Sequence, residues 1–329
     1  MVIPIASDPW ALGIDTSAYT TSIAAVHASG RWIQERQVLD VPSGHRGLRS
    51  SEALFQHVRN LPDLVNRVLD QLEREALVAV AVSVAPRPAR DSYLPVFSAG
   101  ASVAKCLASL GSVPLLATTH QEGHIRAGLA GTGLGVDRPF LACHISGGTT
   151  ELLSVQKGRH GFAMTLLGVS DDLYAGQMID RIGVLLGLGF PAGPGVDQLA
   201  ESAPAAYPIP WSRPRLREGL WRTSFSGPTS HAERALAKGA PKAEVARGVL
   251  ESLVASLVHL IQTAASPQDL LIIGGVAANS LLRKEMSGRL TPGGFRIWFA
   301  DPDWSRDNAI GVGYLGLDFW RRQNEGGRE

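Results

Sequence analysis

The alternation of apolar and polar positions along the chain predicts an α/β protein. Apolar residues recur every three to four positions over 51–72, which is the spacing of an amphipathic helix, and a second long helix is expected over 243–265. Continuous apolar runs at 77–84 and 270–273 are typical of buried strands. Because strands and helices alternate in both halves of the chain, we expect helices packed on a sheet in both halves.

One strand–turn–strand pattern occurs twice, over 12–26 and again over 141–153. Each copy has an apolar strand, a turn of small and hydroxyl residues, and a second strand rich in β-branched residues. Backbone N–H groups in such turns bind anions, and glycine lets a ligand approach the backbone closely. Two facing turns would hold a phosphate chain between two lobes, whereas two ordinary hairpins are the alternative.

Composition places the chain among globular proteins of a reducing compartment. Its 45% hydrophobic and 19% charged residues are distributed without an apolar run long enough to span a bilayer, so no membrane partner is expected. The two cysteines, Cys106 and Cys143, lie in unrelated contexts, which argues against a thiolate metal site. With no secretion signal at the start, we expect a cytoplasmic protein.

A net charge of +1 means that any contact with RNA must come from a local patch. The candidate is an arginine cluster with two interleaved tryptophans, Trp211 and Trp221, which could bind phosphates and stack bases. A solvated loop with extended arginines is the alternative. The arginines of this cluster are Arg213, Arg215, Arg217 and Arg222.

A histidine pair is the candidate metal site. His120 and His124 lie four residues apart, hence on one face of a helix, where both could bind one divalent cation. In a zincin the glutamate directly follows the first histidine, whereas Glu122 lies two residues after His120, roughly 200° around the helix, so a zincin protease is rejected. The natural third ligand is Asp307, which we also expect to act as the N-cap of a last helix over 308–320. Two histidines and one carboxylate leave coordination positions open, as in catalytic sites, whereas a solvated helix face is the alternative.

These residues belong to a longer series of motifs through which the chain resembles the tRNA threonylcarbamoyladenosine transferase family. That family, formerly described as glycoproteases, lies within the actin/sugar-kinase/Hsp70 superfamily. The match covers nearly the whole chain. Its pieces are Gly13-Ile14-Asp15-Thr16-Ser17, His120 with His124, Ser146-Gly147-Gly148, Ala175-Gly176 with Asp180, Phe190-Pro191-Ala192-Gly193-Pro194, Phe225-Ser226-Gly227, Gly274-Gly275-Val276-Ala277-Ala278-Asn279, and Asp307-Asn308.

The resemblance implies a two-lobed fold of duplicated ribonuclease-H-like lobes with a nucleotide cleft between them. We place the lobes at 1–111 with 301–329 and at 112–300. It implies that His120, His124 and Asp307 bind iron or zinc. It also implies an adenine nucleotide, threonylcarbamoyl-AMP as donor, and two protein partners, a TsaB-like paralogue and a TsaE-like ATPase. The implied nucleotide and threonylcarbamoyl site comprises His144, Ile145, Ser146, Gly147, Gly148, Asp180, Gly193, Asp197 and Asn279.

The chemistry of these residues is compatible with that site. Asp180 and Asp197 could accept hydrogen bonds from ribose hydroxyls, and Gly274-Gly275 would let an adenine ring lie close to the backbone. Without the resemblance, the expected roles are a solvated helix carboxylate for Asp180 and a helix cap for Asn279.

Two departures from the family pattern point to a divergent branch or paralogue. Tyr19-Thr20 stands where the family carries an Asp-Glu pair, and Pro86-Arg87-Pro88 replaces a Gly-Pro-Gly segment. The leading hypothesis is transfer of threonylcarbamoyl to N6 of the adenosine beside the tRNA anticodon, with no general base assigned. The alternatives are carbamoyl or acyl transfer to a small-molecule acceptor, and a non-catalytic nucleotide-binding regulator of an active paralogue.

Overall fold

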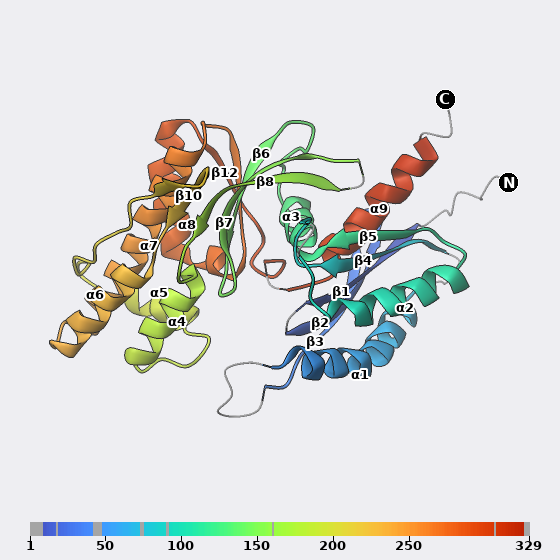
Figure 1. Cartoon of the computed structure of the whole chain (residues 1–329), viewed down its shortest axis with the longest axis horizontal. Helices are drawn as coiled ribbons and strands as arrows, with labels where there is room; N and C mark the ends of the chain where they lie inside the picture. Colours follow the sequence, from blue (N-terminus) through green and yellow to red (C-terminus); the bar gives the residue numbers. More distant parts are fainter. Residues whose placement is uncertain are drawn as a thin grey trace. The chain divides into compact units, whose positions relative to one another are not determined.

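The structure is a computed structural model that describes residues 9–17, 19–41, 48–72, 76–89, 92–159, 161–305 and 307–325. The chain divides into two compact units. Unit 1 comprises 1–130, 158–162 and 306–329, and unit 2 comprises 131–157 and 163–305. Each unit contains one sheet with helices packed against it (Figure 1).

Unit 1 is built on a five-stranded sheet in the order β3-β2-β1-β4-β5. The first three strands form an antiparallel meander, and β4 and β5 continue the sheet in parallel with β1. The strands are β1 Trp10–Ser17, β2 Thr20–His27, β3 Trp32–Val38, β4 Leu77–Ala85 and β5 Leu115–Thr119. The helices of this unit are α1 Ser50–Leu69, α2 Phe97–Leu110, α3 His120–Ala130 and α9 Ile310–Glu325.

The two faces of this sheet have different partners because side chains alternate along β1. Leu12 and Ile14 point into a core shared with α1 and α2. Gly13 faces α9, since a Cβ there would collide with the backbone of Gly313. Asp15 has the parity of Gly13 and therefore projects on the face that carries α3 and α9.

Unit 2 contains a seven-stranded sheet in the order β12-β11-β6-β7-β8-β10-β9. Its core lies between the sheet and helices α4 to α8, and 14 of the 23 residues of α7 are buried. The strands are β6 Phe140–Ile145, β7 Thr150–Lys157, β8 Phe162–Ser170, β9 Arg215–Arg217, β10 Leu220–Thr223, β11 Asp269–Ile273 and β12 Arg296–Phe299. The helices are α4 Ala175–Leu185, α5 Gly193–Glu201, α6 Ser226–Ala237, α7 Lys242–Ala264 and α8 Ser280–Leu290, with short 3-10 turns η2 Gly275–Ala278 and η3 Thr291–Gly293.

The two sheets repeat one topology. The order β3-β2-β1-β4-β5 recurs in unit 2 as β8-β7-β6-β11-β12, with the β9–β10 hairpin added at one edge. The two copies of the strand–turn–strand pattern are the equivalent hairpins β1–β2 and β6–β7. The predicted duplication of an α/β lobe is therefore confirmed.

Residues 112–130 differ from the expected division of the chain, which assigned them to the second lobe. Strand β5 pairs with β4, and α3 packs on α9, so both elements belong to unit 1. The apolar pattern of a buried strand does not reveal which sheet the strand joins, because hydrogen-bonding partners leave no mark on periodicity.

Asp307 is not the N-cap of the last helix, contrary to the expectation from the sequence. Helix α9 begins at Ile310, and the Ile310 amide donates to the Asn308 side chain at 3.0 Å. A later start places Asp307 in the segment before the helix. The carboxylate then lies near the two histidines of α3.

No helix in the described part of the chain is long and apolar enough to cross a membrane.

Candidate metal centre and nucleotide site

Unit 1 brings together the three residues proposed as metal ligands. The Asp307 Oδ1 atom lies 3.3 Å from His124 Nε2 and 3.6 Å from His120 Nε2, and the two Nε2 atoms are 3.0 Å apart. One potential ligand atom from each residue lies within 4.8 Å of the others. This spacing suits three ligands with bonds near 2.0–2.2 Å to one ion.

Close packing of α3 on α9 sets this spacing. Gly311 lies directly against the backbone of Gly123, where a Cβ on Gly311 would collide with the Gly123 carbonyl oxygen. The start of α9 is thereby held beside the face of α3 that carries His120 and His124. Asp307, three residues before α9, is delivered to the same place.

Glu122 stabilises the start of α3 and is not directed at the histidines. Its Oε2 atom accepts hydrogen bonds from the Thr118 hydroxyl at 2.9 Å and from the Thr119 amide at 3.1 Å, while Oε1 accepts from the Phe162 amide at 3.1 Å. The expectation that Glu122 points away from the metal site agrees with these contacts.

Asp15 is the residue of this centre that the sequence did not single out. Both of its carboxylate oxygens lie 3.1 Å from His120 Nδ1, and Ser83 donates a short hydrogen bond to Oδ1. Burial alone would raise the pKa of Asp15, but the charge and hydrogen bond of His120 lower it below its usual value. The signal in the sequence was the motif Gly13-Ile14-Asp15-Thr16-Ser17, which gave Asp15 no role at the metal site.

The pKa of His120 is shifted in the opposite direction to that of Asp15. Burial would lower its pKa, yet the Asp15 carboxylate and, more weakly, Asp307 raise the pKa to about 9. A divalent cation bound at this centre would compete with a proton for His120.

The implied nucleotide site lies wholly in unit 2, around the β6–β7 turn. The Ser146 amide donates to the Thr149 carbonyl at 2.8 Å, and helix α4 begins against the turn, with the Gly176 amide 3.0 Å from the Ser146 carbonyl. Gly176 has no room for a side chain, since a Cβ would lie 2.7 Å from the Gly147 nitrogen. By contrast, a Cβ on Gly147 or Gly148 would meet nothing within 4 Å, so this face of the turn is open to a ligand.

The segment after β11 lies against the same turn. Gly274 has φ +98°, and a Cβ there would collide with the Ile145 carbonyl oxygen, so only glycine permits this approach. The next residue, Gly275, again faces open space. His144 and Ile145 form the buried end of β6 beneath this contact.

Asn279 caps helix α8, as expected of this residue when it is considered apart from the family resemblance. Its Oδ1 atom accepts from the Leu282 amide at 2.8 Å. Its Nδ2 atom is buried, with no hydrogen-bond partner among the described residues. An unsatisfied buried donor is costly, and a bound ligand or water would satisfy it.

Both aspartates of the implied site accept hydrogen bonds from backbone amides. Asp180 Oδ1 accepts from the Ala192 amide at 2.8 Å, which fixes the segment before Gly193 at the start of α5. Asp197 Oδ2 accepts from the Ser280 amide at 2.8 Å, at the start of α8. Asp180 is thus more than a solvated helix carboxylate. Whether either aspartate also meets a ribose stays a prediction.

The arginine cluster lies on the edge hairpin β9–β10 of unit 2. Arg213, Arg215 and Arg217 are exposed, and the Arg213 guanidinium lies 5.6 Å from the centre of the Trp211 ring. Arg222 is half-buried, and its Nη1 atom lies 2.6 Å from Asp171 Oδ1. Arg222 is therefore committed to an ion pair within the unit.

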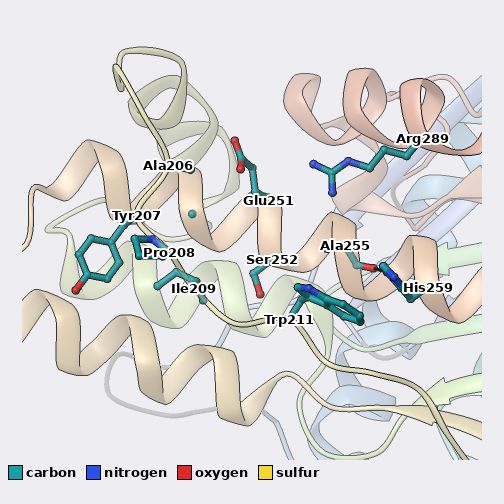
Figure 2. Close-up of a pocket in the computed structure, with 11 residues that line it drawn as sticks. Ala206, Tyr207, Pro208, Ile209, Trp211, Glu251, Ser252, Ala255, His259 and Arg289 are labelled. Carbon is teal, nitrogen blue, oxygen red and sulfur yellow. Dashed lines mark hydrogen bonds between the residues drawn. The ribbon is translucent and has the colours of Figure 1, made fainter.

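A surface hollow of about 320 Å³ lies elsewhere on unit 2, between the segment 206–211 and helix α7. Trp211 and His259 both line it and lie side by side (Figure 2), with ring centres 3.9 Å apart. Glu251 and Arg289 also line it. It contains none of the residues of the implied nucleotide site.

Comparison with solved structures defines the class of fold. The chain is similar to full-length HypF in a phosphate- and nucleotide-bound form, with TM-score 0.58 and 12% identity over 96% of this chain and 46% of that one. It is also similar to a ROK family glucokinase from Streptomyces griseus in complex with glucose and AMPPNP, with TM-score 0.54 and 13% identity over 94% of this chain and 99% of that one. The fold is thus of the actin/sugar-kinase/Hsp70-like class, as predicted.

Sequence comparison identifies the family. The model of TsaD, tRNA N6-adenosine threonylcarbamoyltransferase, matches residues 37–314. A protein of that name from Thermus thermophilus is 35% identical over 325 residues, covering 96% of this chain and 94% of its own length. Another from Ralstonia pickettii is 31% identical, covering 93% and 90%. The chain belongs to the TsaD family of tRNA N6-adenosine threonylcarbamoyltransferases, and the resemblance seen in its motifs is confirmed.

Proposed function

We propose that this protein transfers a threonylcarbamoyl group from threonylcarbamoyl-AMP to N6 of the adenosine next to the anticodon in tRNA. The observation that carries the proposal is the family match over 37–314, which includes His120, His124, Asp307 and all residues of the implied nucleotide site. In the transfer, the N6 nitrogen forms a bond to the carbamoyl carbon. The bond from that carbon to the phosphate oxygen breaks, and AMP and a proton leave.

The residues of unit 1 fit a divalent metal ion of the iron or zinc type. His120 and His124 supply imidazole nitrogens and Asp307 a carboxylate oxygen, and Asp15 lies on the far nitrogen of His120. A metal bound there would supply Lewis-acid polarisation and a fixed point of attachment for the donor. Three protein ligands leave coordination positions available to substrate oxygens.

The residues of unit 2 fit the adenylate part of the donor. In the Ser146–Gly148 turn, the Ser146 amide donates to the Thr149 carbonyl and the Gly148 amide to the Ser146 hydroxyl, so the Gly147 amide is the group of this turn that suits a phosphate. The open faces of Gly147 and Gly275 give room for a nucleotide. The buried Asn279 Nδ2 atom could donate a hydrogen bond to an acceptor on that nucleotide. We infer that His144, Ile145, Gly148, Asp180, Gly193 and Asp197 complete this site. Hydrogen bonds from these groups would orient the donor for attack.

For the acceptor, we propose that Arg213, Arg215 and Arg217 contact tRNA phosphates. These side chains are exposed on an edge hairpin and clustered within five residues. Arg222 serves instead to hold the hairpin to Asp171. We also propose that a TsaB-like paralogue and a TsaE-like ATPase are partners of this protein, as the family resemblance implies.

The β1–β2 turn favours a second candidate function, that of a non-catalytic regulator. Tyr19 is exposed and Thr20 is buried at this turn, so neither position offers a carboxylate to a substrate. A protein without this acidic pair could bind the nucleotide and regulate an active paralogue without catalysing transfer.

One assay separates the two candidates. Purified protein is incubated with unmodified tRNA and threonylcarbamoyl-AMP, with and without the expected partners, and modified adenosine is measured by mass spectrometry of nucleosides. We expect product from the wild type and none from His124→Ala. Nucleotide binding without product, together with failure to restore the modification in cells depleted of their own enzyme, would favour the regulatory function. Transfer of the threonylcarbamoyl group to an added small-molecule amine in the absence of tRNA, with release of AMP, would indicate a small-molecule acceptor.

A further inference from the structure

The His120 ring is engaged on both sides. Its Nδ1 atom lies 3.1 Å from each oxygen of Asp15, and its Nε2 atom faces His124 and Asp307. An ionised carboxylate only accepts hydrogen bonds, so the contact with Asp15 requires a proton on Nδ1. When the ring is neutral, the lone pair is then on Nε2, the side where the other two candidate ligands converge.

Asp15 is itself held in place. It is completely buried, Ser83 donates to its Oδ1 atom, and the Ser17 amide donates to Oδ2 at 3.3 Å. Strands β1 and β4 are adjacent and parallel, with Ile14 opposite Val82, so Asp15 and Ser83 project from the same face of the sheet. A carboxylate is buried without loss of its charge only where such partners surround it.

The sheet thus links to α3 through a chain of three side chains, Ser83 to Asp15 to His120, all within unit 1. The rotation of an imidazole ring about its Cβ–Cγ bond is otherwise restricted only by packing. Carboxylates that accept from the second nitrogen of a ligating histidine fix both the tautomer and the ring plane.

We propose that Asp15 is a positioning residue for the metal centre: held by Ser83 and the Ser17 amide, it orients His120 so that Nε2 is presented to a divalent cation. The inference rests on the proposed function, because it takes His120, His124 and Asp307 to be metal ligands. It assigns to Asp15 no contact with the substrate.

The test measures binding of the metal alone. Full-length protein is stripped with a chelator and titrated with Co²⁺, whose visible absorption reports both affinity and ligand geometry. We expect Asp15→Asn to raise the Kd for Co²⁺ by about 10- to 100-fold, the usual cost of losing an outer partner, and to alter the absorption bands. Ser83→Ala, which leaves the carboxylate in place, should raise the Kd by a smaller factor. Asp15→Glu, which restores a carboxylate, should recover affinity relative to Asp15→Asn.

Thr16→Val is the matched control. Thr16 is buried on the same strand and donates to the Val96 carbonyl at 3.0 Å on the opposite side of the sheet. Its replacement perturbs β1 without touching Asp15, so the Kd for Co²⁺ should stay at the wild-type value. An equal loss of affinity in Thr16→Val and Asp15→Asn would show that Asp15 acts only through the stability of the strand.

Two further variants separate this inference from the proposed function. If His120→Ala and His124→Ala bind Co²⁺ as the wild type does, the metal centre itself is wrong and the role of Asp15 falls with it. If both lose Co²⁺ binding while Asp15→Asn keeps the wild-type Kd and spectrum, the centre stands and the positioning role is overturned. Should Asp15→Asn fail to fold, the same comparison is made with Ser83→Ala, and an unchanged Kd there overturns the proposal.

Discussion

Thr119 and Glu122 cap helix α3 reciprocally. The Thr119 amide donates to Glu122 Oε2 at 3.1 Å, and the Glu122 amide is 3.3 Å from Thr119 Oγ1, the two bonds of a capping box. The first residue of the helix is His120, so this cap fixes where the histidine pair begins. A sequence motif that looks like part of a protease signature is in fact a helix start.

Replacing Glu122 should therefore reduce stability and spare metal binding. We expect Glu122→Ala to lower the free energy of unfolding by about 2 kcal/mol, because buried amides and hydroxyls lose their acceptor. Urea unfolding measures this loss, and Co²⁺ titration should still give one equivalent per chain. Glu285→Ala is the control, since Glu285 forms an exposed pair with Arg289 and should change stability by less than about 0.5 kcal/mol. Loss of the bound equivalent in Glu122→Ala would mean that Glu122 takes part in the centre.

Periodicity predicted most of the fold because burial and side-chain alternation are local properties. The strand at 77–84 and the long helix at 243–265 were expected within one or two residues of β4 and α7. The convergence of Asp307 with the histidines was proposed from residue chemistry and from the family. The predicted strands and helices and the proposed metal site all rest on residue types that can be read directly from the sequence.

What the sequence did not reveal depends on contacts between distant segments. The hydrogen bond from His120 to Asp15 joins residues 105 positions apart, and the motif that contains Asp15 suggested only a turn near phosphate. The start of α9 was displaced because Asn308, one residue later than Asp307, supplies the side-chain acceptor. A solvated loop was the alternative considered for the arginine-rich segment, yet Glu218 and Gly219, both at positive φ, turn it into a hairpin.

Nucleotide binding can be tested at two glycines whose replacement the fold tolerates. A Cβ on Gly147 or Gly275 would meet nothing within 4 Å, so valine at either position should leave the protein folded. We expect Gly147→Val and Gly275→Val to abolish binding of ADP in calorimetry, because the side chain occupies the space through which the ligand approaches the backbone. Gly288→Val, at a similarly open position within α8, is the control for substitution as such. Undiminished affinity in both site variants would place the nucleotide elsewhere.

His57 should make the stability of the protein depend on pH. Its ring is buried on α1, with Nδ1 2.9 Å from the Thr21 hydroxyl. Burial lowers the pKa of His57 to about 4, although the Asp15 carboxylate acts in the opposite direction. In the unfolded chain the ring takes up a proton near pH 6.5, and in the folded protein only near pH 4. The unfolded state thus binds more protons between these values, and the free energy of unfolding falls as pH drops from 6.5 to 4.

The change attributable to His57 is at most about 3 kcal/mol over this range. Urea unfolding of the wild type and of His57→Gln at several pH values isolates it, because the carboxylates are common to both proteins. We expect the two stabilities to diverge as the pH falls from about 6.5 to about 4, with the wild type losing more as acid is added. His231→Gln, at a half-buried position in α6, is the control. Parallel curves for the wild type and His57→Gln would show that the ring is protonated equally in both states.

Binding of tRNA should depend on the exposed arginines of the β9–β10 hairpin. With a net charge of +1, the protein has no general attraction for polyanions, so phosphate contacts have to be local. We expect Arg213, Arg215 and Arg217 replaced together by alanine to weaken tRNA binding. The slope of log K against log salt should flatten by about one unit for each arginine–phosphate pair that the substitutions remove.

A second triple variant, in which Arg59, Arg234 and Arg289 become alanine, is the control for this prediction. These three arginines are exposed elsewhere on the chain, so the variant removes the same charge and should keep the slope of the wild type. Equal slopes for the two triple variants would show that net charge governs binding and that the hairpin is not the contact surface. A wild-type affinity no tighter than roughly 10⁻⁴ M, the weak end of non-specific binding, would turn the assignment of the acceptor away from tRNA.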